Sequence, residues 1–220
     1  MMAKLYALQI SPLLPENRWE ALLPLLSPQR QQRILACRHG ADRARLAGAG
    51  WLLRYALSQE GIPVHAQQFT TSPDGKPLLA NGSLDFSLSH SGEWVLCAVS
   101  SQLVGVDVEL PRCTLATARR FFAPEEVAMV ESLPKSAQAD ALLRLWTAKE
   151  AFTKALGTGL KQGLGSFSVR LDQNGATLVQ NISPLPFRLE EYVLPGCRAC
   201  LCTLEPRTPL LEVSLPLVNT

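Results

Sequence analysis

The order of the expected helices and strands constrains the fold of this 220-residue chain more than any other feature. Apolar periodicity and turn residues predict helices followed by strands, and the same succession then occurs a second time. The first succession is a strand at 4–10, helices at 16–26, 29–37 and 41–59, and strands at 68–72, 84–89 and 94–100. The second is a strand at 103–110, helices at 115–122, 124–132 and 138–156, and strands at 167–171, 176–179, 187–192, 199–204 and 211–215.

This repeated order indicates an α+β fold of two similar α/β halves. We expect the joint near residues 100–104, which gives an N-terminal half of residues 1–102 and a C-terminal half of residues 103–220. The duplication rests on element order alone, because the sequence contains no close internal repeat. Two helix ends are well marked: Ser27 and Pro28 are suited to begin a helix, and Gly157 is suited to end one.

Composition excludes several classes of protein. Hydrophobic residues make up 47% of the chain, which supports a packed core, and 21 basic against 19 acidic residues give a net charge of +2. That balance argues against a nucleic-acid-binding protein, which usually has a large basic excess. No run approaches the roughly 18 apolar residues that span a bilayer, and the N-terminus lacks the pattern of a signal peptide. We therefore expect a cytoplasmic protein that binds no membrane.

The six cysteines point to a core strand rather than to a metal site. Cys197, Cys200 and Cys202 lie close together among apolar residues. Structural zinc sites usually bring a second pair of ligands, and none is evident here. We expect reduced, buried thiols.

The segment 105–109, Gly-Val-Asp-Val-Glu, is the first group of residues that points to chemistry. Alternate residues of a strand share a face, so Asp107 and Glu109 point one way while Val106 and Val108 point into a core. Two carboxylates about 7 Å apart along a strand suit one hard cation. The alternative is an ordinary strand with a polar, solvent-facing side.

The segment 146–154 is the second group. Helical spacing puts Trp146, Lys149, Glu150 and Lys154 on one broad face. Glu150 would then add a third oxygen ligand, and the two lysines would hold phosphate groups. The alternative is a core tryptophan beside a surface Glu–Lys pair.

Two further groups suit a phosphorylated ligand. The segment 87–92, Ser-Leu-Ser-His-Ser-Gly, resembles the end of a strand and a turn that offers hydroxyls, an imidazole and backbone N–H groups to phosphate. An ordinary polar turn is the alternative. Basic residues are scattered at Arg30, Arg33, Arg45 and Lys76, and each of them alone suits a solvated surface. The glycine-rich segment 157–165 follows a helix rather than preceding one, so we expect a connector and not a phosphate loop.

Taken together, these segments resemble the Sfp type of 4′-phosphopantetheinyl transferase. The family's G-[IV]-D-[IV]-E strand matches residues 105–109, and its W-x-x-K-E-x-x-x-K helix matches residues 146–154. The S-H-S-G and G-K-P elements match residues 89–92 and 75–77, and residues 121–126 and 166–170 resemble further family positions. The resemblance covers nearly the whole chain, and four motifs in the right order are far more specific than one.

The resemblance implies two halves related by a pseudo-twofold axis, with coenzyme A in the cleft between them. It implies Mg²⁺ bound by Asp107, Glu109 and Glu150. It also implies a set of residues that bind coenzyme A: Ser89, His90, Arg30, Arg33 and Arg45 at the 3′-phosphate end, Lys76 along the nucleotide, and Lys149 and Lys154 at the pyrophosphate. Leu46 replaces a small hydroxyl residue, and Arg30 and Arg33 replace lysines, of the family pattern.

The expected reaction is attack of a carrier-protein serine on the β-phosphate of coenzyme A, with release of 3′,5′-ADP. Such a transfer depends on positioning and charge neutralisation. Lys154 would stabilise the leaving group, and Glu150 would act as the base, directly or through a metal-bound water. Two alternatives stay open: a metal-dependent phosphohydrolase that uses water, and a non-catalytic module that binds coenzyme A or a carrier.

The expected partner is an apo acyl or peptidyl carrier protein, docked at the mouth of the cleft. Phe121, Phe122 and Met129 would contribute apolar contacts there, with burial in the core as the alternative. The sequence does not indicate which carrier is served, whether of fatty-acid, polyketide or peptide synthesis. We expect a monomer, since a cleft within one chain needs no partner subunit.

Overall fold

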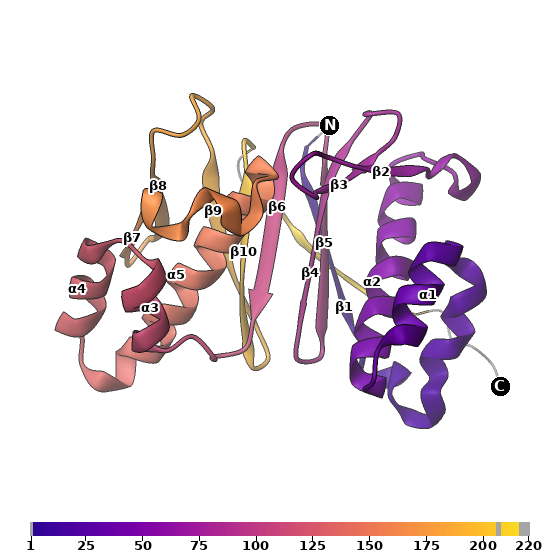
Figure 1. Ribbon diagram of the computed structural model, residues 1–220, viewed down its shortest axis with the longest axis horizontal. Helices are drawn as coiled ribbons and strands as arrows, with labels where there is room; N and C mark the ends of the chain where they lie inside the picture. Colours follow the sequence, from indigo (N-terminus) through magenta and orange to yellow (C-terminus); the bar gives the residue numbers. More distant parts are fainter. Residues whose placement is uncertain (1, 206–207, 216–220) are drawn as a thin grey trace.

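The computed structural model describes residues 2–205 and 208–215. Two sheets stand side by side in the middle of the molecule, with helices on the outer side of each (Figure 1). The first sheet has the order β11-β1-β5-β4 and the second β6-β10-β9. The strands of the first sheet are β1 (Lys4–Gln9), β4 (Asp85–Ser91), β5 (Trp94–Ser100) and β11 (Leu210–Val213). Those of the second sheet are β6 (Val104–Glu109), β9 (Arg188–Leu194) and β10 (Cys197–Thr203).

The two halves share one topology. In each, a first strand is followed by a long helix and then by an antiparallel hairpin, and the last strand of the hairpin lies in the middle. The order β1-β5-β4 therefore corresponds to β6-β10-β9, and all of these pairings are antiparallel. The long helices are α2 (Gly40–Gln59) and α5 (Lys135–Leu156). The expected α+β fold of two similar halves is confirmed. One strand crosses between them, because β11 from the end of the chain pairs in parallel with β1.

Three apolar layers hold this arrangement together. Alternate residues of each strand face opposite sides of the sheet. Tyr6 and Leu8 pack toward α2, whereas Leu5 and Ala7 pack between the two sheets. The third layer lies between the second sheet and α5, where Cys200 and Cys202 are buried. All six cysteines are free thiols; four of them are buried as expected, whereas Cys37 and Cys113 are half-buried.

The remaining elements surround these layers. Helix α1 (Pro28–Ala36) lies against α2, and α3 (Leu115–Phe121) and α4 (Pro124–Ser132) lie near α5 (Figure 1). Two small hairpins complete the fold, β2 (Phe69–Thr71) with β3 (Pro77–Leu79), and β7 (Ser168–Asp172) with β8 (Gly175–Val179). Strand β3 was not predicted. No helix in the described ranges has the length and apolarity to cross a membrane.

Helix ends agree with the sequence prediction except in one segment. The Ser27 hydroxyl accepts a hydrogen bond from Arg30 N at the start of α1, and Gly157 ends α5 in the left-handed conformation. The segment 16–26 is wrong as a regular helix. It forms 3₁₀ turns over Pro15–Leu25, with Glu16 and Asn17 at positive φ and Pro24 in the interior. Proline removes an intrahelical hydrogen bond and clashes with the preceding turn, which disfavours a regular α-helix at the end of this segment.

Candidate active site

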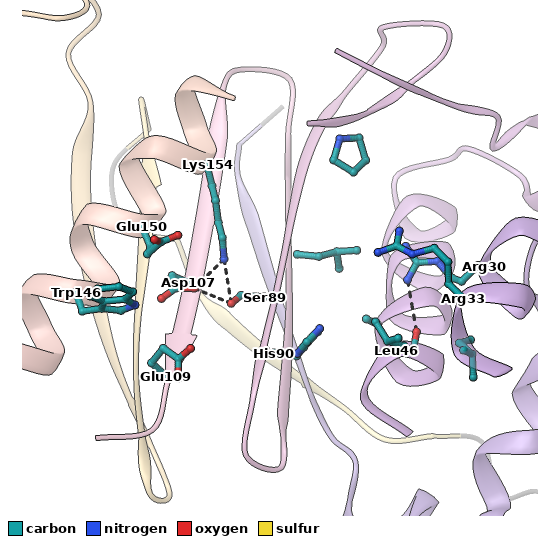
Figure 2. A pocket seen from close by; sticks show the side chains of 14 residues that line it. Arg30, Arg33, Leu46, Ser89, His90, Asp107, Glu109, Trp146, Glu150 and Lys154 are labelled. Atoms are coloured by element: carbon teal, nitrogen blue, oxygen red, sulfur yellow. Dashed lines mark hydrogen bonds and ion pairs between the residues drawn. The ribbon is translucent and has the colours of Figure 1, made fainter. Parts of the chain in front are cut away.

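A cavity of about 440 Å³ lies in the cleft between the two halves. One wall comes from α1, α2 and β4, and the other from β6 and α5 (Figure 2). Its lining includes most of the residues singled out in the sequence: Arg30, Arg33, Leu46, Ser89, His90, Asp107, Glu109, Trp146, Glu150 and Lys154. Basic side chains lie on the first wall, and the three carboxylates and Lys154 lie on the second (Figure 2).

Strand β6 presents two of the carboxylates. Asp107 is 4% exposed and Glu109 is half-buried, while Val106 and Val108 pack between the sheets. The predicted alternation of strand 103–110 is therefore confirmed. The absence of a side chain at Gly105 allows α5 to pack closely on β6, beside these two carboxylates. A Cβ at this position would lie 2.0 Å from the Ala151 carbonyl oxygen, so only glycine allows the helix to pack on the strand here.

Helix α5 presents the third carboxylate. Trp146, Glu150 and Lys154, which are spaced by four residues, line the cavity along one side of the helix (Figure 2). Lys149 does not. Its ammonium is fully buried, forms an ion pair of 2.8 Å with Glu126 Oε2, and donates to the carbonyls of Leu164 and Phe167 at 2.7 Å. The predicted contact of Lys149 with pyrophosphate is wrong, because residue 149 lies about 100° around the helix from residue 150.

The three carboxylates of the second wall lie close together and are partly removed from solvent. Lys154 Nζ lies 2.7 Å from Asp107 Oδ1 and 3.1 Å from Ser89 Oγ. Asp107 Oδ2 is buried and has no hydrogen-bond partner among the described residues. Burial raises the pKa of Glu150, and the neighbouring charges of Asp107 and Glu109 raise it further, whereas Lys154 lowers it. The site therefore holds more negative charge than its single ammonium neutralises.

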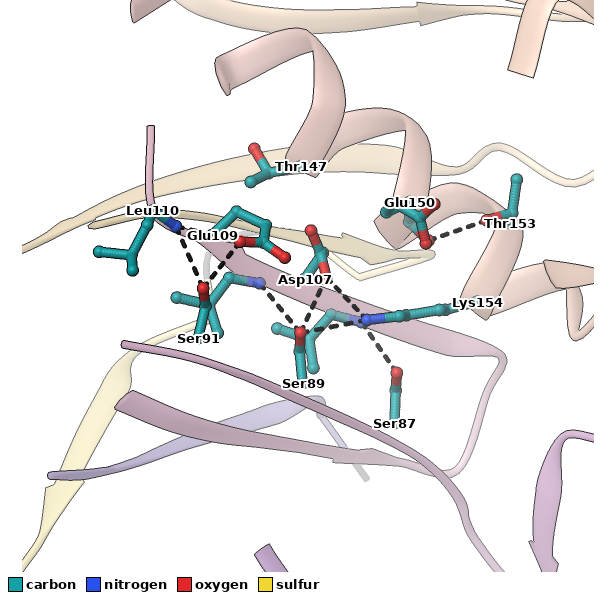
Figure 3. Close-up of polar contacts among 12 residues, drawn as sticks. Ser87, Ser89, Ser91, Asp107, Glu109, Leu110, Thr147, Glu150, Thr153 and Lys154 are labelled. Atoms are coloured by element: carbon teal, nitrogen blue, oxygen red, sulfur yellow. Dashed lines mark hydrogen bonds and ion pairs between the residues drawn. The ribbon is translucent and has the colours of Figure 1, made fainter. Parts of the chain in front are cut away.

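A row of serines joins the two walls of the cleft (Figure 3). The hydroxyls of Ser87, Ser89 and Ser91 on β4 accept hydrogen bonds from backbone N–H groups of residues 106, 108 and 110, at 3.0, 3.2 and 3.2 Å. Asp85 accepts from Val104 N at 2.9 Å in the same way. We call these four contacts the serine seam. Strand β4 continues to Ser91, beyond the predicted end at residue 89, because its backbone pairs with β5 as far as Ser91 and Trp94.

The seam changes the interpretation of Ser89. Its hydroxyl donates to Asp107 Oδ1 at 2.8 Å and accepts from Val108 N and from Lys154. A hydroxyl has one donor and two acceptor positions, so all of its capacity is used. In this structure the Ser89 hydroxyl is therefore held by protein groups, and its contact with the 3′-phosphate stays a prediction. Its neighbour His90 has an exposed side chain on the same wall as Arg30 and Arg33. Partial desolvation of its imidazole, followed by the charge of Arg45, lowers its pKa.

The basic residues are held in different ways. Arg30 packs over Gly50 of α2 and donates to the Leu46 carbonyl at 3.4 Å. Arg33 lines the cavity beside it. Arg45 lies at the turn after β4, where it donates to the Gly92 carbonyl at 3.0 Å and pairs with Asp42.

Lys76 lies apart from these, beside a neighbouring cavity of about 250 Å³. Its ammonium is 2.6 Å from Asp85 Oδ2 and also contacts the carbonyls of Val104 and Ala155. The side chain therefore fastens the β2–β3 turn to the end of α5. A contact between Lys76 and the nucleotide stays a prediction.

The donor set of the second wall suits a hard cation. Carboxylate oxygens are the ligands that Mg²⁺ prefers, and a buried oxygen without a partner is an available ligand. Within the described part of the chain, no three His, Cys, Asp or Glu side chains are already arranged to hold a metal ion. The ammonium of Lys154 lies 2.7 Å from Asp107 Oδ1 and supplies positive charge beside these carboxylates.

Sequence reasoning named Glu126 as a family position and Ser91 within the segment 87–92, but it missed the contacts of both. Glu126, the buried partner of Lys149, also accepts from Ala123 N and Val169 N, and so joins α4 and β7 to α5. Ser91 lies beside Glu109, and its Oγ donates to Glu109 Oε2 at 2.7 Å. The alternating serines at 87, 89 and 91 were the available signal, because that spacing puts three hydroxyls on one face of a strand.

Comparison with known proteins agrees with this geometry. Residues 103–197 match the family model described as the 4′-phosphopantetheinyl transferase superfamily, and residues 14–102 match that of the N-terminal region of 4′-phosphopantetheinyl transferase. The chain is 32% identical over 211 residues to 4′-phosphopantetheinyl transferase Sfp of Bacillus subtilis, covering 94% of each. It is 34% identical to 4′-phosphopantetheinyl transferase psf-1 of Bacillus pumilus, covering 92% of this chain and 91% of that protein.

A fold of two helix-covered sheets with a carboxylate-lined cleft, together with these relatives, defines a group-transfer enzyme. The chain belongs to the 4′-phosphopantetheinyl transferase superfamily. It is a 4′-phosphopantetheinyl transferase, which moves the 4′-phosphopantetheine group of coenzyme A to a carrier protein. The resemblance seen in the sequence is thereby confirmed, and the hydrolase and the non-catalytic binding module are set aside.

Proposed function

We propose that this transferase acts with Mg²⁺ bound by Asp107, Glu109 and Glu150 in the cleft. The observation that carries the proposal is the crowding of three carboxylates in one cavity, with Asp107 Oδ2 buried and unpartnered among the described residues. Buried like charges are costly unless a cation neutralises them. When bound, the ion would neutralise the pyrophosphate of coenzyme A and the charge that develops during transfer.

Charge also supports an orientation for coenzyme A. The basic wall, with Arg30, Arg33 and His90, suits the 3′-phosphate end, and Arg45 lies beside it. Guanidinium groups bind phosphate through paired hydrogen bonds, which suits Arg30 and Arg33 to this position. The pyrophosphate then lies toward Lys154 and the carboxylates on the opposite wall.

The reaction joins the serine hydroxyl of the carrier to the β-phosphorus of coenzyme A and breaks the bond to the α-phosphate oxygen, which releases 3′,5′-ADP. We assign acceptance of the serine proton to Glu150, the carboxylate of α5 that lines the cavity. We assign stabilisation of the leaving phosphate to Lys154, the ammonium nearest to the carboxylates.

The carrier is an apo acyl or peptidyl carrier protein, and Phe121 is the apolar residue that suits its docking. Its ring is 41% exposed, and the Arg120 guanidinium lies 5.0 Å from the ring centroid. Phe122 is buried, and Met129 packs against the same core. Both residues therefore belong to the core rather than to a docking surface. An exposed ring beside a cation suits the acidic surface expected around a carrier serine.

A titration of Mg²⁺ by calorimetry, with coenzyme A present and no carrier, tests the metal site. We expect binding to the parent protein, and a loss of at least about tenfold in affinity in Asp107→Ala, Glu109→Ala and Glu150→Ala. Glu20→Ala, which removes an exposed carboxylate far along the sequence, is the matched control and keeps the parent affinity. Equal affinity in the parent and in Asp107→Ala would reject the assignment.

We further propose that the boundary between the halves lies at residues 102 and 103, and that the enzyme acts as a cytoplasmic monomer. Support for the boundary comes from the start of β6 at Val104 and from the two family models, which meet there. Support for a monomer comes from the cleft, whose two walls belong to one chain. Light scattering after gel filtration tests this state, and a dimer mass would contradict it.

A further inference from the structure

We propose that Ser91 is a positioning residue for the metal site, because it holds Glu109 with one oxygen fixed and the other free for a ligand. This inference rests on the proposed Mg²⁺ site. Ser91 is 6% exposed and lies on β4, in the half of the molecule opposite to Glu109. It therefore ties the position of a proposed metal ligand in one half to a side chain of the other half.

Ser91 contacts both a side chain and the backbone of β6. Its Oγ donates to Glu109 Oε2 at 2.7 Å and accepts from Leu110 N at 3.2 Å. Glu109 Oε2 also accepts from Leu110 N at 3.2 Å, so this oxygen has two donors. Because these two donors hold Oε2, Oε1 is the oxygen of Glu109 left for a ligand in the cavity that this residue lines.

A free glutamate side chain must lose rotamer freedom before it can bind a cation. Ser91 removes part of that freedom in advance, and hydrogen bonds from neighbours to ligand carboxylates typically affect metal affinity by 10–100-fold. The role is positioning, since Ser91 itself would touch neither the metal nor coenzyme A.

The seam contains its own control. Ser87 is equally buried, at 6% exposure, and its Oγ accepts from Val106 N at 3.0 Å just as Ser91 accepts from Leu110 N. The residue of β6 that would correspond to Glu109 is Gly105, which has no carboxylate. Ser87 and Ser91 therefore share the contact that joins the walls, and only Ser91 adds a contact to a proposed ligand.

The experiment compares Mg²⁺ binding by calorimetry, with coenzyme A present, in the parent protein, Ser91→Ala, Ser91→Thr and Ser87→Ala. We expect about tenfold weaker binding in Ser91→Ala, parent affinity in Ser91→Thr, which keeps the hydroxyl, and parent affinity in Ser87→Ala. The half-saturating Mg²⁺ concentration for transfer should rise in parallel in Ser91→Ala, while kcat at saturating Mg²⁺ stays close to that of the parent.

The outcomes separate the proposed metal site from the proposed positioning role of Ser91. If Asp107→Ala binds Mg²⁺ like the parent, the proposed metal site fails. If Asp107→Ala loses binding but Ser91→Ala does not, or if Ser87→Ala loses as much, the role of Ser91 fails and the metal site stands. Should Ser91→Ala not fold, Ser91→Cys keeps the size with a weaker donor, and parent affinity in that variant overturns the inference.

Discussion

Lys154 Nζ lies 2.7 Å from Asp107 Oδ1, so the ammonium of α5 forms an ion pair with the carboxylate of β6 inside the cleft. Asp107 is 6% exposed at its side chain and Lys154 is 28% exposed, which leaves the pair only partly screened by water. The contact puts a cation of the protein where we propose that Mg²⁺ binds. We propose two functions for Lys154, as the internal counter-ion of the free enzyme and as a phosphate ligand during transfer.

Removal of Lys154 should therefore change metal affinity and turnover in opposite directions. Without coenzyme A, Lys154→Met should bind Mg²⁺ about tenfold more tightly, because a competing positive charge a few ångströms away is gone. Turnover should fall by at least about 100-fold, since the leaving phosphate loses its cation. Lys154→Arg keeps the charge and should keep the parent affinity in the same calorimetric titration. Weaker Mg²⁺ binding in Lys154→Met would contradict the counter-ion function.

Lys149 should behave as a structural residue. Lys149→Met leaves the carboxylate of Glu126 buried with only two N–H donors, from Ala123 and Val169. We expect a loss of about 3 kcal/mol in the free energy of unfolding, measured by urea denaturation. The double variant Lys149→Met/Glu126→Gln removes the unpaired charge and should recover part of this loss. A stable single variant with a raised KM for coenzyme A would instead restore the pyrophosphate function.

Gly105 should tolerate no side chain. In Gly105→Ala, the new Cβ would lie 2.0 Å from Ala151 O and 2.3 Å from Ala155 N, and both are backbone atoms of α5. Helix and strand must separate, so we expect a loss of more than about 3 kcal/mol in stability and no detectable transfer. Gly40→Ala is the control, because the nearest atom to its new Cβ is 3.9 Å away. Thermal melts that coincide for the two variants would show that the close approach is not required.

Neutralising Glu150 should stabilise the metal-free protein. Burial, followed by the charges of Asp107 and Glu109, raises the pKa of Glu150, so the folded state favours its protonated form. Stability from this group is present at low pH and is lost as pH rises through the raised pKa. At neutral pH, Glu150→Gln should gain about 1 kcal/mol, seen as a melting temperature about 2–4 °C higher. The difference in melting temperature between Glu150→Gln and the parent should vanish below pH 4. A lower melting temperature for Glu150→Gln at neutral pH would contradict the repulsion among the three carboxylates.

The sequence predicted most elements of the fold because their signals are local. The alternation of residues 103–110 and the helix stop at Gly157 depend on neighbours along the chain, and both are present. Element order was sufficient to predict two halves. The parallel pairing of β11 with β1 could not be predicted from the sequence, because strands about 200 residues apart share no local pattern.

The site was predicted less completely than the fold. Spacing put Trp146, Lys149 and Glu150 on one broad face, but the two lysines of the helix diverge, since a buried carboxylate on α4 takes Lys149. Nothing in the sequence around Lys149 indicates Glu126 as its partner. The serine seam was hidden for a similar reason: three serines suggest a polar turn until the strand opposite them is known.

The mass of an apo carrier protein after incubation with coenzyme A and the enzyme is the most direct test. With Mg²⁺, the parent enzyme should add one phosphopantetheine group to the carrier and release an equal amount of 3′,5′-ADP. With a chelator in place of Mg²⁺, or with folded Asp107→Ala at ordinary Mg²⁺, the carrier mass should not change. Full modification of the carrier by Asp107→Ala, at the rate of the parent, would contradict the account.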